Sequence, residues 1–160
     1  MPVAASLASE RAAILTAARS VGVFTSEEVD TVEELFDGYL RDPQESGYNF
    51  LSYRGADADA DAVSGFACWG PTALSNGAAD LYWICTAREA QGRGVAAALF
   101  HAVEDSVRSA GRWLIVIWTS SRADYGAARH FYQHMGCELT AQIADFYDRG
   151  DDLCVFTRRL

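Results

Sequence analysis

Cys85-Thr86-Ala87-Arg88-Glu89-Ala90-Gln91-Gly92-Arg93-Gly94-Val95-Ala96 is the stretch that decides the fold, because an apolar segment enters it and a helical pattern leaves it. The four residues before it, 81–84, are aromatic or aliphatic, which predicts a strand. From Val95 onward apolar residues recur at nearly helical spacing, and Gly111 predicts where that helix ends. Glycines between a strand and a helix N-terminus let backbone N–H groups surround an anion. We therefore expect residues 91–96 to hold a diphosphate.

Two common phosphate-binding motifs do not fit this loop. Gly92, Gly94 and Ala97 have the spacing of a dinucleotide fingerprint, which is weak evidence alone. That fingerprint also needs an acidic residue about 20 positions later to bind a ribose, whereas the next predicted strand, 113–119, is followed by two serines and has no acidic residue at its end. No Gly-Lys-Ser/Thr follows the glycines, which excludes a Walker loop.

Two segments of the chain match a different pair of signatures. Gln91-x-x-Gly94-x-Ala96 fits a Gln/Arg-x-x-Gly-x-Gly/Ala loop, and Ala128-Arg129-His130-Phe131-Tyr132-Gln133-His134-Met135-Gly136-Cys137 fits Ala-x-x-Phe-Tyr-x-x-x-Gly-Phe. In this order and spacing they resemble the GNAT superfamily, the acetyl-CoA-dependent N-acetyltransferases. The resemblance covers roughly residues 48–160, with one helix and one strand between the signatures. Residues 119–121, 131–132, 145–147 and 150–152 further resemble a bacterial subgroup without an assigned acceptor.

The resemblance implies acetyl-CoA as the co-substrate and assigns residues to it. In that superfamily the strand before the loop binds the pantetheine arm, and the loop binds the pyrophosphate. The corresponding residues are Ile84, Cys85, Thr86, Gln91, Gly92, Arg93, Gly94, Val95 and Ala96. Tyr132 corresponds to the general acid that protonates the coenzyme A sulfur, although a tyrosine on an amphipathic helix is also a common core residue. Tyr125 stands where the superfamily often has an asparagine that contacts the cofactor.

The general base is less defined by the sequence. Asp80, at the start of the strand that leads into the loop, is the first carboxylate to test. Glu34 and Tyr82 are the alternatives, and deprotonation of the amine through water is another. Asp80 is also a typical turn residue, so its assignment stays open here.

Metal chemistry is not indicated by the remaining motifs. His130 and His134 have the i, i+4 spacing of a chelating pair, but no glutamate lies between them and His101 is the only other histidine. Three aspartates alternate with alanines in residues 55–61, without the glycine and glutamate of a calcium loop. We predict a hairpin turn there, and no metal site in the chain.

The cysteines and the overall charge limit the environment of the protein. No Cys-x-x-Cys occurs, and the four cysteines have apolar neighbours: Cys68, Cys85, Cys137 and Cys154. Buried free thiols in a cytoplasmic protein are the prediction. Thirteen basic and 22 acidic residues give a net charge of −9, which argues against a nucleic-acid or membrane surface. No apolar run approaches the ~20 residues of a membrane span.

The whole chain, residues 1–160, is expected to form a single GNAT-like domain, with residues 1–8 as a flexible tail. Helices are predicted from a Ser9 cap to residue 20, from a Ser26 cap to Pro43, and from an Asp124 cap to residue 135. Further strands are predicted at residues 48–53, 63–70, 137–147 and 153–158. The fold class is α/β (α+β), which the resemblance extends to a mixed, mostly antiparallel sheet of six to seven strands with helices on both faces.

The resemblance implies direct transfer of an acetyl group from acetyl-CoA to a primary amine of a small molecule or peptide. The alternative is a catalytically degenerate domain that binds acyl-CoA as a sensor, and a third reading is a nucleotide-binding module. The sequence leaves open the acceptor, the acyl length and the oligomeric state, a homodimer included.

Overall fold

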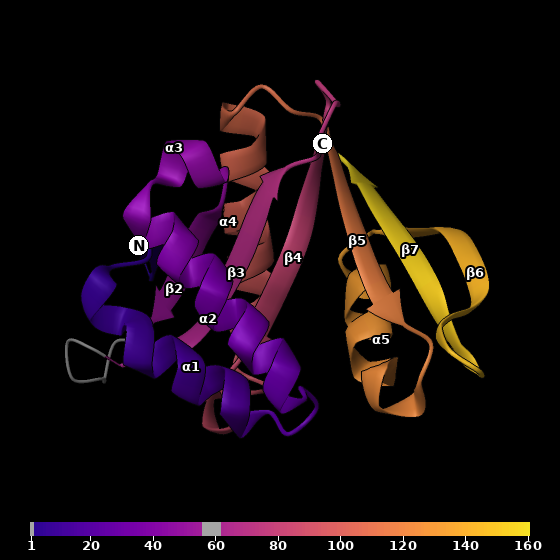
Figure 1. Ribbon diagram of the computed structural model, residues 1–160, viewed down its shortest axis with the longest axis horizontal. Coiled ribbons are helices and arrows are strands. Elements are labelled where there is room, and N and C mark those ends of the chain that lie inside the picture. Colours follow the sequence, from indigo (N-terminus) through magenta and orange to yellow (C-terminus); the bar gives the residue numbers. More distant parts are fainter. Residues whose placement is uncertain (1, 56–61) are drawn as a thin grey trace.

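Seven strands form one sheet in this computed structural model, which describes residues 2–55 and 62–160 (Figure 1). In spatial order they are β1 (Val3–Ala5), β2 (Asn49–Arg54), β3 (Val63–Pro71), β4 (Ala78–Thr86), β5 (Leu114–Ser120), β7 (Asp151–Arg159) and β6 (Glu138–Asp148). All neighbouring pairs are antiparallel except β4 and β5, which are parallel. The predicted mixed, mostly antiparallel sheet is therefore confirmed.

Helices cover both faces of the sheet, as predicted. Helices α1 (Arg11–Ser20) and α2 (Ser26–Arg41) lie on one face, whereas α4 (Val95–Ser109) and α5 (Gly126–His134) lie behind the strands (Figure 1). Short helical segments complete the chain: η1 (Ala8–Glu10), α3 (Pro43–Ser46), η2 (Arg88–Ala90) and η3 (Ala123–Tyr125). Each long helix buries an apolar stripe, which excludes water and stabilises the two layers on the sheet. Fully buried examples are Ile14, Val32, Phe36, Leu99 and Val103.

The N-terminal segment differs from the prediction of a flexible tail. Val3–Ala5 pairs with β2 as strand β1, and the Ser6 N–H donates to the Phe50 carbonyl at 3.0 Å. An exposed three-residue strand has no apolar alternation to reveal it, so its pairing depends on β2 offering a free edge. The hairpin turn predicted at residues 55–61 lies almost entirely outside the described residues.

Helix caps also depart from the sequence prediction. Thr25, not Ser26, caps α2: its side chain accepts from the Glu28 N–H, and Glu28 accepts from the Thr25 N–H. The first helix begins with η1, which has no side-chain cap at Ser9. Asp124 does not cap α5, because its carboxylate forms an ion pair with Arg122 instead.

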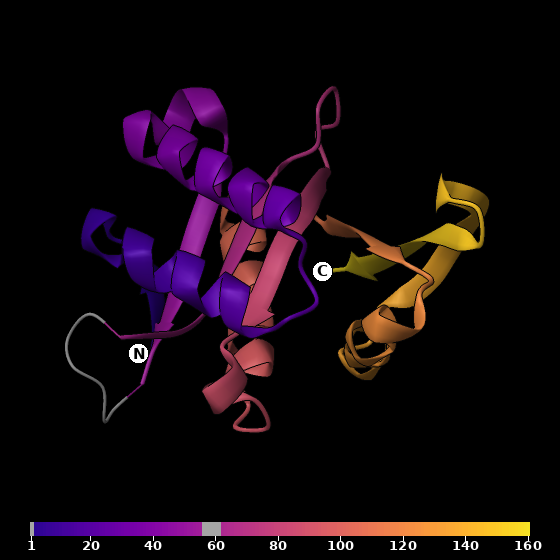
Figure 2. The same ribbon diagram turned by 60° about the horizontal axis from the view of Figure 1, so that its bottom comes forward.

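Two irregularities separate β4 from β5. The parallel pairing covers only Ala78–Asp80 of β4, although β4 continues to Thr86. On the other side of β4, Cys68 is opposite Trp83 and Trp69 is opposite Leu81, which leaves Tyr82 unmatched as a bulge. A bulge bends its strand and increases the local twist. Beyond Asp80, strands β5, β7 and β6 therefore turn away from β4 (Figure 2).

Candidate functional site

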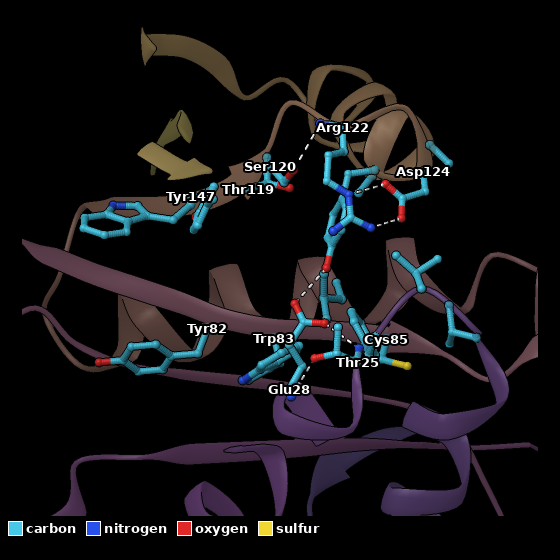
Figure 3. A pocket seen from close by; sticks show the side chains of 18 of the residues that line it. Thr25, Glu28, Tyr82, Trp83, Cys85, Thr119, Ser120, Arg122, Asp124 and Tyr147 are labelled. Carbon is cyan, nitrogen blue, oxygen red and sulfur yellow. Dashed lines mark hydrogen bonds and ion pairs between the residues drawn. The ribbon is translucent and has the colours of Figure 1, made fainter. Parts of the chain in front are cut away.

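A cleft of about 980 Å³ occupies the space between the diverging strands β4 and β5. Strand β4 lines it with Tyr82 to Thr86, and β5 lines it with Trp118 to Ser120. The α1–α2 connection, α5 and the β6–β7 turn close its other sides. Figure 3 shows this cleft with Tyr82 and Tyr147 at one end and Arg122 and Asp124 at the other.

The open edge of β4 forms one wall of the cleft. In the described chain no strand pairs with this edge beyond Asp80, so an extended ligand with amide groups could hydrogen-bond there. Ile84, Cys85 and Thr86 all line the cleft, as expected for this wall. The Thr86 hydroxyl is buried and has no hydrogen-bond partner among the described residues. Because buried polar atoms are nearly always paired in proteins, this hydroxyl fits a site that receives a polar ligand.

The side chain of Cys85 is buried and is not suited to act as a nucleophile. It is 4 % exposed, its thiol contacts the Ala17 carbonyl at 3.8 Å, and burial raises the pKa of the thiol to about 12. A thiol with such a pKa stays protonated near neutral pH and is a weak nucleophile. All four cysteines are free and buried, as predicted.

The glycine loop lies at the N-terminus of α4. Gly92 and Gly94 have φ values of +75° and +78°, in the left-handed region that favours glycine. Gly94 is the N-cap of α4 and provides no side-chain cap, so N–H groups of the first helical turn are free to bind an anion. A Cβ atom on either glycine would meet nothing within 4 Å. The backbone conformation and the open space are therefore compatible with a bound phosphate.

The six residues of this loop do not all face the cleft. Gln91 lines it, whereas Gly92, Arg93, Gly94, Val95 and Ala96 do not. The Val95 side chain is buried in the core. The exposed Arg93 lies between the two glycines, where its positive charge would favour a phosphate.

Tyr132 is a buried tyrosine that lines the cleft. Its side chain is 7 % exposed and lines the cleft, and its ring packs on Phe156 with centroids 5.7 Å apart. Burial raises the pKa of this phenol, which keeps it protonated at neutral pH. A protonated hydroxyl on a residue that lines a ligand cleft is suited to donate a proton or a hydrogen bond.

Tyr125 forms a bridge across the cleft. Its hydroxyl donates to the Glu28 carboxylate at 2.9 Å, which connects the start of α2 with the segment before α5. Burial, together with the Glu28 carboxylate, raises the pKa of Tyr125. Tyr125 lines the cleft, and its hydroxyl already has a partner. The sequence did not indicate this pair, whose members lie 97 positions apart.

Asp80 lies in a smaller pocket that adjoins the cleft. This pocket has a volume of about 240 Å³ and is lined by Asp80, Leu81, Tyr82, Val116 and Trp118. Tyr82 and Trp118 line both spaces. Burial raises the pKa of Asp80, which makes it a stronger base than an exposed aspartate. Glu34, the alternative carboxylate, is exposed on α2 and lines neither space.

Several polar residues of the cleft were missed by the sequence analysis. Ser120 donates a hydrogen bond to the Asp151 carboxylate, and both side chains are buried in the cleft wall. The carboxylates that line the cleft are those of Glu27, Glu28, Asp124, Asp148 and Asp151. Arg122 is the one cationic side chain among the lining residues, and it is paired with Asp124. A net negative cleft attracts cationic molecules.

Residues 2–55 and 62–160 contain no group of three or more histidine, cysteine, aspartate or glutamate side chains that could hold a metal ion. Within the same residues, no helix combines the length and the apolar character needed to cross a bilayer.

The comparisons with known proteins agree with one another. A family model described as an acetyltransferase (GNAT) domain matches residues 50–138. A GNAT-family protein of known structure from Desulfovibrio desulfuricans is 33 % identical over 98 % of both chains, with a TM-score of 0.91. No curated protein matches the sequence.

Two more distant structures contain ligands and share the fold. One, from Salmonella typhimurium with its cofactor acetyl-CoA, is 19 % identical over 99 % of this chain and 92 % of that one, with a TM-score of 0.73. The other is an aminoglycoside 6'-N-acetyltransferase complexed with coenzyme A, 12 % identical over 99 % and 97 % of the two chains, with a TM-score of 0.73.

Proposed function

This chain belongs to the GNAT acetyltransferase family, and on that premise we propose that it transfers an acetyl group from acetyl-CoA directly to a primary amine of a small molecule or peptide. The observation that carries the proposal is the unpaired edge of β4, which ends near the buried Thr86 hydroxyl that has no hydrogen-bond partner among the described residues. The chain continues from this edge into the glycine loop at the start of α4. An open strand edge binds a peptide-like arm, and a glycine loop at a helix N-terminus binds a diphosphate, so a ligand with these two parts in this order fits the site.

The residues of the cleft fit coenzyme A in two places. The backbone of Ile84, Cys85 and Thr86 would hold the pantetheine amides along the open edge of β4. The pyrophosphate would bind at residues 91–96, where N–H groups at the α4 N-terminus and the Arg93 side chain favour negative charge. The Tyr125 ring would contact the cofactor beside this path, while its hydroxyl stays on Glu28.

Acetyl-CoA supplies a thioester that is already activated, so the chain mainly has to align an amine with it. N–H groups on the open edge of β4 would stabilise negative charge that develops on the carbonyl oxygen. Asp80 would accept the proton of the amine, and Tyr132 would give its phenolic proton to the departing sulfur. Burial raises the pKa of both groups, which suits a base that must bind a proton and an acid that must still hold one.

We further propose that residues 1–160 form one catalytic domain that acts in the cytoplasm. The N-terminal third supports the single-domain reading, because α1 and α2 bury their apolar stripes on the same sheet that carries the cleft. Four buried free thiols suit a reducing compartment.

Release of free coenzyme A thiol from acetyl-CoA, measured against a library of amines, tests this function. The sequence contains no lysine, so no lysine side chain of the protein competes as an acceptor. We expect thiol release that depends on both the protein and an amine, together with calorimetric binding of acetyl-CoA. Binding without turnover for any amine would instead favour the catalytically degenerate domain, and absence of binding would contradict both.

The pH dependence of turnover tests the role of Asp80. Because its pKa is raised, kcat/KM should fall as the pH decreases through a value above the 3.8 of an ordinary aspartate. Asp80→Asn should remove this acidic limb and lower kcat by about 100-fold. Asp105→Asn, at an exposed position on α4, is the control and should retain the limb. An unchanged limb in Asp80→Asn would assign the base elsewhere.

Asp80→Asn should lower turnover but raise the stability of the folded protein at neutral pH. A raised pKa means that the folded state favours the protonated carboxyl, so the stability contributed by that proton is lost as the pH rises through the folded pKa. Asp80→Asn, which is neutral at every pH, should therefore have a higher Tm than the native protein at pH 7 and a similar Tm at pH 4. A lower Tm at pH 7 would show that Asp80 is a structural residue.

A further inference from the structure

Resting on the proposed function, we propose that the acceptor is a small primary amine joined by a short chain to an aromatic ring, and that it carries no carboxylate. Its binding site is the space lined by Asp80, Leu81, Tyr82, Val116 and Trp118, called the acceptor pocket below.

The composition of the acceptor pocket selects for an ammonium group on an apolar body. Asp80 is its one ionisable carboxylate, and the other four side chains present aliphatic or aromatic surface. The side chains of Tyr82 and Trp118 are 42 % and 59 % exposed, which are large fractions for aromatic residues. Aromatic faces beside a carboxylate stabilise an ammonium by cation–π attraction and by charge pairing, and they pack well on a ring.

Neighbouring residues hold the two aromatic side chains in place. The Trp118 ring meets Phe146 of β6 edge-to-face, with centroids 5.7 Å apart, and the Tyr82 ring meets Tyr48 in the same way at 5.7 Å. Tyr82 is also the bulged residue of β4, so the divergence of the two strands is what places these rings at the cleft. A rigid aromatic wall binds a flat group at a small entropic cost.

Charge around the pocket disfavours an acceptor with a carboxylate. Asp148 and Asp151 line the adjoining cleft, and its one lining cation, Arg122, is already paired with Asp124. No side chain of the acceptor pocket carries a positive charge that could form an ion pair with an anion. An amino acid would therefore leave its carboxylate without a partner in a negative site, whereas the decarboxylated amine meets only favourable charge.

The volume of the pocket limits the size of the acceptor. About 240 Å³ is below the range of roughly 300–1,000 Å³ for sites of drug-sized ligands, so one ring with a short chain fits better than a polyamine or a peptide. Because Tyr82 and Trp118 line both spaces, a molecule in the pocket borders the cleft proposed for acetyl-CoA. In that position the amine would lie beside the cofactor.

Initial rates with four amines test this proposal on the native protein. The probe is 2-phenylethylamine, and the comparisons are phenylalanine, 1,4-diaminobutane and a tetrapeptide with N-terminal phenylalanine. We expect kcat/KM for 2-phenylethylamine to exceed that of phenylalanine by at least about 100-fold, and the other two by at least about tenfold. If any comparison amine had a kcat/KM equal to or higher than that of 2-phenylethylamine, the proposed acceptor would be wrong. The proposed acetyltransferase function would still hold, because that amine would be acetylated.

Variants of Trp118 locate the binding site independently of turnover. Calorimetry should give a Kd for 2-phenylethylamine that rises at least about tenfold in Trp118→Ala and less than about threefold in Trp118→Phe, which keeps a ring. Leu139→Ala, at an exposed apolar position on β6 outside both spaces, is the control and should bind like the native protein. Equal affinity in Trp118→Ala and the native protein would overturn the assignment of the pocket, even if no amine were acetylated.

Discussion

Tyr132→Phe is expected to lower kcat by about 100-fold or more while the KM for acetyl-CoA changes by less than about twofold. The substitution keeps the aromatic ring that packs on Phe156, so the core contact of this side chain is retained. It removes the only proton that the Tyr132 side chain can donate in the cleft, and burial keeps that proton on the native phenol at neutral pH. Steady-state kinetics with acetyl-CoA and the best amine of the library measure the effect.

Tyr53→Phe is the matched control for this variant. Tyr53 is a partly buried tyrosine of β2 that packs on the core and does not line the cleft. Both variants should keep a Tm within a few degrees of the native value, and only Tyr132→Phe should lose turnover. Native turnover in Tyr132→Phe would show that the tyrosine is a core residue and that the sulfur takes its proton from water.

Gly94→Ala is expected to weaken binding of acetyl-CoA by about 10- to 100-fold, measured as Kd by calorimetry. The added methyl group enters open space at the N-terminus of α4, and the φ of +78° is strained for alanine. Loss of one or two N–H bonds to a charged phosphate, at about 1.5–3 kcal/mol each, accounts for a change of this size. The backbone strain adds roughly 1–2 kcal/mol of destabilisation to the folded protein.

Gly111→Ala separates the strain from the loss of the phosphate site. Gly111 follows the other end of α4, has a φ of +74° and also has nothing within 4 Å of an added Cβ. The two variants should therefore lose similar stability, and Gly111→Ala should bind acetyl-CoA with native affinity. If both variants bound acetyl-CoA equally, residues 91–96 would not be the pyrophosphate site.

The order of secondary-structure elements could be predicted from local patterns. The apolar stretch before Cys85, the glycines at positions 92 and 94 and the helical spacing after Val95 correspond to β4, its loop and α4. These features are local because side-chain periodicity and glycine backbone preferences act over a few residues. The second signature likewise placed Tyr132 on a helix facing the sheet.

Predictions that required a choice between neighbouring partners were wrong. Thr25 and Ser26 are equally good caps by type, and only the reciprocal bonds with Glu28 single out Thr25. Asp124 has the chemistry of a cap but pairs with Arg122. In each case two favourable local interactions compete, and the position of the surrounding backbone determines which one forms.

The sequence by itself determined the family, the order of the strands and helices that follow β1, and a glycine loop with the backbone freedom to receive a phosphate, because each depends on residue type and short spacing. Only the tertiary structure decided where the chemistry can take place. The limited β4–β5 pairing and the bulge at Tyr82 open the cleft, and they bring Asp80 and Trp118 into one pocket. Strand divergence depends on the register between segments far apart in the chain, which no single stretch of sequence encodes.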